Sequence, residues 1–259
     1  MSSSISIADA LSSSVRQAEG RCWRFVEAQH HVSTTKLTDT LAEQRRLEAL
    51  IDATKPAIPP ECRDLHFLLA TPFRYGAPYP NGSRFRRAGS TLGVFYGARR
   101  EETAAAEIAY YRLLFFAESP QTPWPANPGQ YTSFRAEYGV NRSVDLTQPP
   151  LDDHRALWTS PVDRGACQAL ADDARALGIE VIKYHSARDP ERGLNIAILS
   201  CRAFTNREPI ALRTWRIHLS SIGARAMQEF PSSALNFDRA AFASDPRIAA
   251  MNWNRPAHH

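Results

Sequence analysis

Residues 93–118 read GVFYGARREETAAAEIAYYRLLFFAE and join a short apolar run to a long helical pattern. The run at residues 92–97 predicts a buried strand, because it is short and rich in apolar side chains. Over residues 101–118 the apolar side chains recur at helical spacing, which predicts one amphipathic helix that ends before Ser119-Pro120. A strand that leads directly into a long helix is thus the centre of the expected fold.

Other predicted elements surround this strand and helix. A capping box formed by Thr40 and Glu43 begins a helix that ends before Lys55-Pro56. Ser160 is the expected N-cap of a third helix, which Gly178 closes. Little regularity is expected in the tail from residue 232. The remaining strands are predicted at residues 21–27, 65–70, 131–138, 143–146, 179–184, 195–201 and 210–219.

This mixture of many strands with a few segregated helices predicts an α+β domain rather than repeated βαβ units. We expect residues 1–64 to form an N-terminal strand and helical extension, and residues 65–220 to form the core. Residues 221–259 are expected to form a C-terminal tail packed on the same single domain.

Composition narrows the class of protein. The chain of 259 residues is 43% hydrophobic and 22% charged, which is enough apolar content for a core. No apolar run approaches the roughly 18 residues of a membrane span, and the first residues lack the blocks of a signal peptide. The net charge of +4 suits an acidic ligand or partner without implying nucleic acid. We therefore expect a soluble cytoplasmic protein with neither a membrane nor a nucleic acid as direct partner.

Cysteine and histidine usage gives no sign of a metal site. The four cysteines are spread singly, at Cys22, Cys62, Cys167 and Cys201. Their spacing predicts neither a disulfide framework nor a zinc site, and it fits a reducing cytoplasm. The pairs His30-His31 and His258-His259 lack a third ligand at useful spacing, so no metal is expected. Tryptophans such as Trp23, Trp158 and Trp215 are expected in the core.

Glu107 is the first candidate for chemistry. It lies on the predicted helix 101–118 among mainly uncharged neighbours. A carboxylate on such a face needs partners if it is buried, because an unpaired buried charge is costly. A half-exposed surface glutamate fits the same periodicity, so its position alone does not decide its role.

The loop at residues 73–89, FRYGAPYPNGSRFRRAG, is the second candidate. Its glycines allow a backbone to approach a ligand closely, its arginines suit phosphate oxygens, and its tyrosines offer flat faces to a ring. This mixture suits an anionic, ring-bearing ligand such as a nucleotide, although a solvated basic loop is the alternative. Neither a Rossmann fingerprint nor a P-loop is present. The arginines are Arg74, Arg84, Arg86 and Arg87, and the tyrosines are Tyr75 and Tyr79.

The third candidate is YHSARDP at residues 184–190, where a predicted strand enters a turn. Ser186 at the strand end can orient a ligand hydroxyl, and Arg188 can meet a phosphate or Asp189. The alternative is simple turn chemistry at Asp189-Pro190 without a ligand. His185 and Ser186 point to opposite faces of a strand, which argues against a Ser–His nucleophile.

Taken in order, these segments resemble the RES family, the toxin half of bacterial RES–Xre toxin–antitoxin pairs. The resemblance covers roughly residues 65–204. It implies a fold like that of ADP-ribosyltransferase toxins, with a mixed sheet core and flanking helices, and a pocket for NAD within the core 65–220. It is carried by GSRFRRAG (82–89), GVFYGA (93–98), ETAAAEIAYYR (102–112), the predicted helix at residues 163–177, and IEVIKYHSARDP (179–190).

The resemblance implies particular site residues. The family's arginine, glutamate and serine match Arg84, Glu107 and Ser186, and its tyrosine matches Tyr96. An earlier family arginine has two competing matches here. These are Arg24 and Arg74, of which we favour Arg74 with its neighbour Tyr75, because they are nearest to the basic loop.

The implied activity is cleavage of the nicotinamide–ribose bond of NAD, with NAD as substrate and no metal. In this reading Arg84 and Arg74 hold the pyrophosphate, while Tyr75 and Tyr96 contact nicotinamide or ribose. Ser186 takes the ribose hydroxyls, and Glu107 accepts a hydrogen bond from ribose and stabilises positive charge.

Several alternatives stay open beside this activity. The acceptor is water, phosphate or a side chain of a host protein, so ADP-ribosyl transfer is the runner-up to net NAD consumption. A nucleotide-binding module without catalysis and a purely structural interaction protein are further alternatives. The resemblance also implies a hetero-oligomer with an Xre-type antitoxin, which would occlude the pocket.

Overall fold

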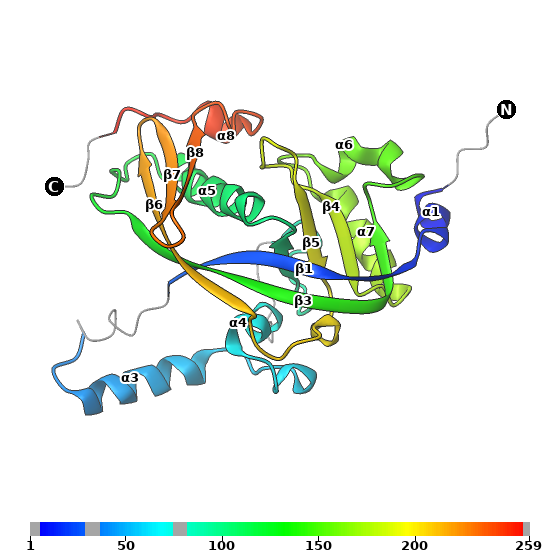
Figure 1. Cartoon of the computed structure of the whole chain (residues 1–259), viewed down its shortest axis with the longest axis horizontal. Helices are drawn as coiled ribbons and strands as arrows, with labels where there is room; N and C mark the ends of the chain where they lie inside the picture. The colour runs from blue at the N-terminus through cyan, green and yellow to red at the C-terminus, as the bar shows by residue number, and fades with distance from the viewer. Residues whose placement is uncertain (1–5, 29–36, 75–81, 256–259) are drawn as a thin grey trace.

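The computed structural model describes residues 6–28, 37–74 and 82–255. Tyr75, Tyr79, His30-His31 and His258-His259 lie outside these residues. One mixed sheet of eight strands dominates the described part, in the order β1-β2-β5-β4-β3-β6-β7-β8 (Figure 1). The strands are β1 (Arg16–Glu27), β2 (Phe95–Ala98), β3 (Gly129–Asp145), β4 (Val181–His185), β5 (Leu194–Ile198), β6 (Ala211–Ser220), β7 (Gly223–Gln228) and β8 (Ser233–Asp238).

The strand pairings close a ring at one end of the sheet. β1 pairs antiparallel with β3 along almost its whole length, and it also meets β2 at Trp23 and Ala98. β2, β5, β4 and β3 complete the ring, with β3 and β4 parallel. The antiparallel strands β6, β7 and β8 extend from β3. The mixed sheet with flanking helices confirms the predicted α+β class.

Helix α5 (Glu101–Glu118) has the bounds that the sequence predicts. Its buried side chains include four alanines, which let the helix lie close to the sheet. It packs in one apolar cluster with Trp23 of β1, Trp215 of β6 and Ile248 of the C-terminal segment. Trp158 is also buried, in a second cluster, so the expectation that these tryptophans lie in the core is confirmed.

The remaining helices flank the sheet. Figure 1 shows α7 and α6 beside β4, and α8 beside the β6–β8 strands. They are α1 (Ile7–Ser13), α3 (Leu41–Thr54), α4 (Phe67–Ala70), α6 (Arg155–Trp158), α7 (Gly165–Ala176) and α8 (Pro246–Ala249), with short 3-10 turns at Pro60–Cys62, Thr71–Phe73, Leu151–His154 and Cys201–Ala203.

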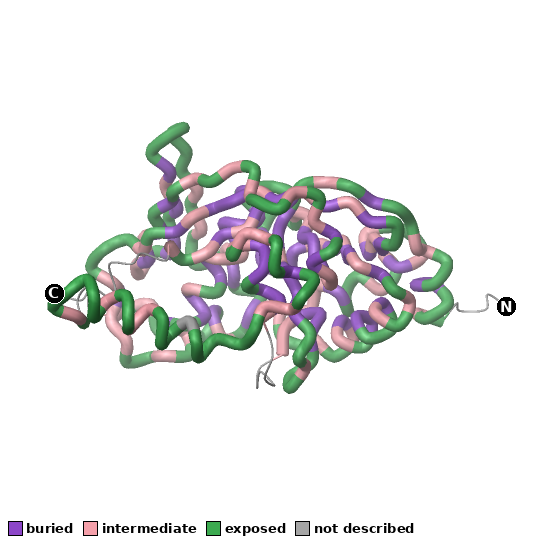
Figure 2. The backbone as a smooth tube through the Cα atoms, turned by 90° about the horizontal axis from the view of Figure 1, so that it is seen from below, coloured by how far each residue is buried: buried purple, intermediate pink, exposed green. Residues whose placement is uncertain are grey.

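The capping box that begins α3 is confirmed. The Thr40 amide donates to Glu43 Oε2, and the Glu43 amide donates to Thr40 Oγ1, both at 3.2 Å. None of the described α3 side chains is buried, and Figure 2 shows this helix as exposed with a few intermediate positions. Local capping rather than packing therefore defines where α3 begins.

Two local predictions were wrong. Residues 65–70 were expected to form a strand, but they contain α4, where His66 Nδ1 accepts from the Leu68 amide. A short apolar run does not distinguish a strand from a helical turn, which explains the error. Helix α7 begins at Gly165 rather than directly after Ser160, because Ser160 Oγ instead caps a separate turn through the Asp163 amide. Gly178 closes the segment with a φ of 67°, as predicted.

The strands also differ from the prediction in two places. Residues 131–138 and 143–146 were expected as separate strands, but β3 is continuous because its pairing with β1 runs through Gly139 and Val140. The tail from residue 232, where little regularity was expected, contains β8 and α8, and β7 lies before it. β8 is an edge strand without a fully buried side chain, so its sequence lacks clear alternation.

A disulfide joins Cys62 to Cys201, which corrects the expectation that the cysteines stay unpaired. The two residues are 139 positions apart, so no spacing rule could pair them. Cys22 and Cys167 are free and buried. The cysteine argument for a reducing compartment therefore loses its basis, since disulfides persist in oxidising surroundings.

The described residues bear on two kinds of feature, a membrane-spanning helix and a metal site. None of their helices combines the length and apolar character that crossing a membrane requires. In residues 6–28, 37–74 and 82–255, no group of three His, Cys, Asp or Glu side chains is arranged to hold a metal ion.

The disulfide gives a first prediction. Cys62→Ser should lower the free energy of unfolding by about 2–4 kcal/mol, because the crosslink restricts the unfolded chain. Denaturant titration under oxidising conditions measures this change. A reducing agent should lower the stability of the wild type to that of the variant and leave the variant unaffected. Wild-type stability that does not respond to reduction would contradict the crosslink.

Candidate functional site

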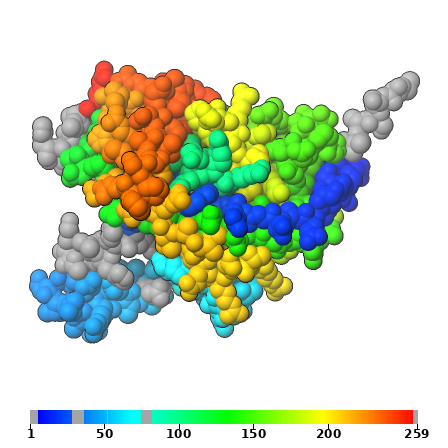
Figure 3. Space-filling model, in the orientation of Figure 1, coloured from blue at the N-terminus to red at the C-terminus, as the bar shows by residue number. Residues whose placement is uncertain are grey.

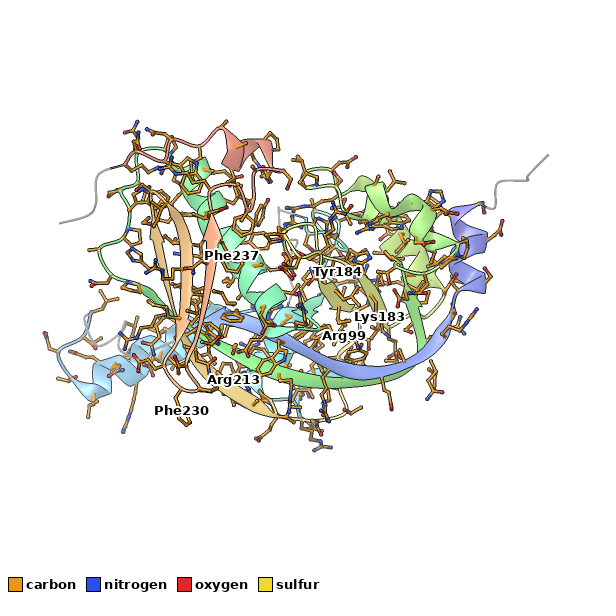
Figure 4. All side chains as sticks on the ribbon, turned by 45° about the horizontal axis from the view of Figure 1, so that its top comes forward. Arg99, Lys183, Tyr184, Arg213, Phe230 and Phe237 are labelled. Atoms are coloured by element: carbon orange, nitrogen blue, oxygen red, sulfur yellow. A yellow bond between two sulfur atoms is a disulfide. The ribbon has the colours of Figure 1, made fainter. Side chains whose placement is uncertain are left out.

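A cavity of about 270 Å³ lies between α5 and the strands β1, β2, β4 and β5. Figure 3 shows the teal segment that includes α5 reaching the surface between the orange C-terminal hairpin and the yellow-green β4–β5 region. Tyr184 of β4, labelled in Figure 4, lines the cavity. The polar and aromatic lining residues are Trp23, Arg24, Phe25, Ser83, Arg84, Tyr96, Glu107, Tyr111, Tyr184, Arg188 and Asn195.

The Glu107 carboxylate is held in the cavity by two donors. Ser186 Oγ and Asn195 Nδ2 each donate to Glu107 Oε1 at 2.6 Å. Glu107 Oε2 lies 3.9 Å from Arg188 Nε, and the side chain retains 21% exposure. The structure thus brings together Glu107 and Ser186, two predicted site residues that are 79 positions apart. One carboxylate oxygen is fixed, and the other is left on the side of Arg188.

Ser186 itself is saturated with hydrogen bonds. Its hydroxyl donates to Glu107 and accepts from the amides of Arg188 and Asp189, at 3.1 and 2.9 Å. The hydroxyl has one proton and two lone pairs, so all three are used. Ser186 therefore orients Glu107 and shapes the turn after β4, while its oxygen has no capacity left for a ligand.

The loop after β4 is fastened to the start of α5. Asp189 Oδ2 accepts from Thr103 Oγ1 at 2.7 Å and from the Gly193 amide at 3.1 Å. A Cβ on Gly193 would lie only 2.1 Å from Thr103 Oγ1, so this close approach requires glycine. Arg100 is the basic neighbour of Asp189, at 3.8 Å. The sequence left Asp189 as a possible partner of Arg188, but the structure pairs Arg188 with Glu107 instead.

Arg84 lines the cavity, but its guanidinium donates hydrogen bonds to backbone carbonyls. Its side chain donates from Nη1 to the Trp158 carbonyl at 2.6 Å and from Nη2 to the Ser160 carbonyl at 3.0 Å. The residue is only 5% exposed. These contacts hold the segment between α6 and α7 against the loop that carries Arg84. The pyrophosphate role that the resemblance implies for Arg84 stays a prediction.

Of the two competing early arginines, Arg24 borders the cavity. Its Nη1 donates to the Tyr96 carbonyl at 2.9 Å, and its guanidinium lies 5.0 Å from the centroid of the Phe95 ring. Arg74 is not among the lining residues, and Tyr75 lies outside the described part of the chain. The geometry therefore favours Arg24 over Arg74, against our preference from the sequence.

Tyr96 forms part of the wall through its ring rather than as an acid or base. Its hydroxyl lies 2.8 Å from Ser83 Oγ and accepts from the Phe85 amide at 2.9 Å. Burial raises the pKa of Tyr96 to about 12, so the phenol stays neutral. Burial likewise raises the pKa of Tyr184 well above its ordinary value. Both rings offer fixed apolar faces to a ligand.

Asn195 and Arg188 are the cavity residues whose contacts the sequence did not predict. Asn195 is 4% exposed and is the single polar residue near the start of an otherwise apolar strand, which was the available signal. The Arg188 guanidinium lies over the Tyr110 ring, 4.7 Å from its centroid. Burial favours the neutral form of Arg188, but Glu107 and Tyr111 more than offset this and raise its pKa.

The charges of the lining favour an anionic ligand. Three arginines, Arg24, Arg84 and Arg188, face one carboxylate, that of Glu107. Aromatic rings complete the wall. A cavity with this balance suits a molecule that carries both phosphate and a planar ring.

Comparisons with known proteins identify the family of the chain. Curated proteins give no match. A chain of the crystal structure of the M. tuberculosis MbcT–MbcA toxin–antitoxin complex aligns with a TM-score of 0.43 and 13% identity, over 76% of this chain and 85% of that chain. The family model of the RES domain matches residues 58–220, which include every cavity residue except Trp23, Arg24 and Phe25. Because this match covers more than half of the sequence, the chain belongs to the RES domain family.

Proposed function

We propose that this RES protein binds NAD in the cavity around Glu107 and cleaves the bond between nicotinamide and ribose. The observation that carries the proposal is the combination of a fixed carboxylate, three arginines and aromatic walls in one cavity. The carboxylate suits a developing positive charge, the arginines suit phosphates, and the rings suit nicotinamide.

Cleavage of this bond needs little acid–base catalysis from the protein. The bond from ribose C1′ to the pyridinium nitrogen breaks, and its electron pair leaves with nicotinamide as a neutral amide. No general acid is needed for that departure, unlike the hydrolysis of an ordinary glycoside. Positive charge develops at C1′, where Glu107 Oε2 would stabilise it and accept a hydrogen bond from a ribose hydroxyl.

The neighbouring residues serve this carboxylate in the proposal. Ser186 and Asn195 hold Oε1, so they position Glu107 and need not touch ribose. Arg24 takes the place that we first gave to Arg74 as a phosphate ligand. Tyr96 supplies a fixed face for nicotinamide or ribose.

An oxygen nucleophile must then add to C1′, and when water adds, its proton passes to the surrounding solvent. Net NAD consumption is our main proposal, in which a small acceptor such as water or phosphate adds. ADP-ribosyl transfer to a protein side chain is the second candidate, and it would use the same bond cleavage. A nucleotide-binding module without catalysis would keep Arg24 and the rings but would not need a fixed Glu107.

The biological role follows from the family resemblance. We assign the chain as the toxin of a type II toxin–antitoxin pair that acts on NAD. An enzyme that consumes NAD harms the cell that makes it, so an inhibitor must accompany it. An Xre-type antitoxin in a hetero-oligomer is the proposed partner, and an anionic group of that partner would suit the arginine-rich cavity.

Glu107→Gln should reduce nicotinamide release from NAD by at least about 100-fold, because it removes the charge that stabilises C1′. The amide retains the shape of the carboxylate, so the melting temperature should change little. Glu102→Gln on the exposed face of the same helix is the matched control and should be fully active. Turnover close to wild type in a folded Glu107→Gln protein would refute the assignment.

Arg84→Lys separates a supporting role from a ligand role. An ammonium cannot reproduce the two hydrogen bonds to the Trp158 and Ser160 carbonyls. We expect a loss of about 1–3 kcal/mol in unfolding free energy and less than tenfold in the affinity of the folded protein for NAD. Denaturation and calorimetry measure the two quantities. Unchanged stability with a larger loss of affinity would instead make Arg84 a pyrophosphate ligand.

Occlusion by the partner is also testable. Expression of the chain alone should be toxic, and co-expression with the product of the neighbouring gene should relieve the toxicity. The purified complex should fail to bind NAD, since the partner fills the cavity. A complex that releases nicotinamide as fast as the isolated chain would rule out occlusion as the mechanism.

A further inference from the structure

Arg188 is held in the cavity by ring faces. Its guanidinium carbon lies 4.7 Å from the Tyr110 centroid and 5.6 Å from the Tyr111 centroid. Tyr110 is itself fixed, because its hydroxyl donates to Asp245 Oδ2 at 2.6 Å and lies 3.1 Å from an Arg247 nitrogen. Cation–π attraction holds a guanidinium in place without using its N–H donors. The Arg188 guanidinium is thus held in position while its N–H donors remain available for hydrogen bonds.

The buried Nε donor of Arg188 is available to a ligand. Within the described residues, its buried Nε has no hydrogen-bond partner. The nearest anion is Glu107 Oε2 at 3.9 Å, which is too far for a hydrogen bond. Arg84 differs, since its nitrogens donate to two backbone carbonyls. Buried polar groups are normally paired, so an arginine that is 6% exposed and lines a cavity without such partners indicates a site for an anion.

We infer that Arg188 binds the phosphate attached to the reacting ribose, beside Glu107. This inference rests on the proposed function and assigns one part of the substrate. A ribose 5′-phosphate carries its anomeric carbon and its phosphate on the same sugar. A ligand whose C1′ faces Glu107 Oε2 therefore has its phosphate within reach of a guanidinium beside that carboxylate. Arg188 suits this phosphate because the planar fork can donate two parallel hydrogen bonds.

The electrostatics favour the same arrangement. The Arg188 charge lies 3.9 Å from Glu107 Oε2, where on its own it opposes the stabilisation of a positive C1′. A phosphate on Arg188 balances that charge and leaves the Glu107 carboxylate to act on C1′. Substrates with this phosphate should therefore be bound and cleaved better than substrates without it.

Two small substrates that differ only in this phosphate provide the test, namely nicotinamide mononucleotide and nicotinamide riboside. For each we would measure kcat/KM for nicotinamide release and, independently of turnover, the shift in melting temperature on binding. The wild type should prefer the mononucleotide in both measurements. Arg188→Gln should lower kcat/KM for the mononucleotide about tenfold or more, whereas kcat/KM for the riboside should rise, because the charge that opposes Glu107 is removed.

Further variants separate this role from structural effects. Arg188→Lys keeps a charge on the tyrosine rings and should retain part of the preference. Arg100→Gln is the matched control, since Arg100 contacts the same loop at Asp189 but does not line the cavity, and it should retain the full preference. Equal losses for both substrates in Arg188→Gln, or a wild type that treats both alike, would overturn the inference. Failure of the wild type to cleave NAD would overturn the proposed function instead.

Discussion

The position of the Glu107 carboxylate depends on donors from two segments that are distant from it in the sequence. α5 carries the carboxylate, the turn after β4 supplies Ser186, and β5 supplies Asn195. Both donors converge on Oε1, which leaves Oε2 on the side of the cavity with Arg188. Because a partly buried carboxylate is tolerated only with partners, the register of all three elements is linked to this one group. The proposed chemistry depends on the same two hydrogen bonds.

A second buried carboxylate, that of Glu101, fixes the helix that carries Glu107. Ser133 Oγ donates to Glu101 Oε1 at 2.5 Å and Trp215 Nε1 donates to it at 2.9 Å, while Arg213 (labelled in Figure 4) binds the other oxygen. These contacts anchor the first turn of α5 to β3 and β6. The Arg213 guanidinium also lies 4.7 Å from the centroid of Trp23, which lines the cavity. One network therefore sets both the start of the helix and part of the cavity wall.

Features with a local cause could be predicted from the sequence. The bounds of α5 follow from helical spacing and a proline stop, and the start of α3 follows from its capping box. The resemblance to the RES family selected Glu107 and Ser186. Features that depend on distant partners could not be predicted, including the Cys62–Cys201 disulfide, the continuity of β3 and the position of Arg24 in the cavity wall. Asn195 escaped notice because its partner lies 88 positions away.

In the proposed function, the Glu107 cavity both binds NAD and breaks its nicotinamide–ribose bond. Incubation of the purified chain, free of any partner protein, with NAD tests this claim most directly when free nicotinamide and remaining NAD are quantified together. The account predicts one nicotinamide released for each NAD lost, over many turnovers per protein molecule. NAD that binds the protein but stays intact throughout the incubation would contradict the account and leave a nucleotide-binding module in its place.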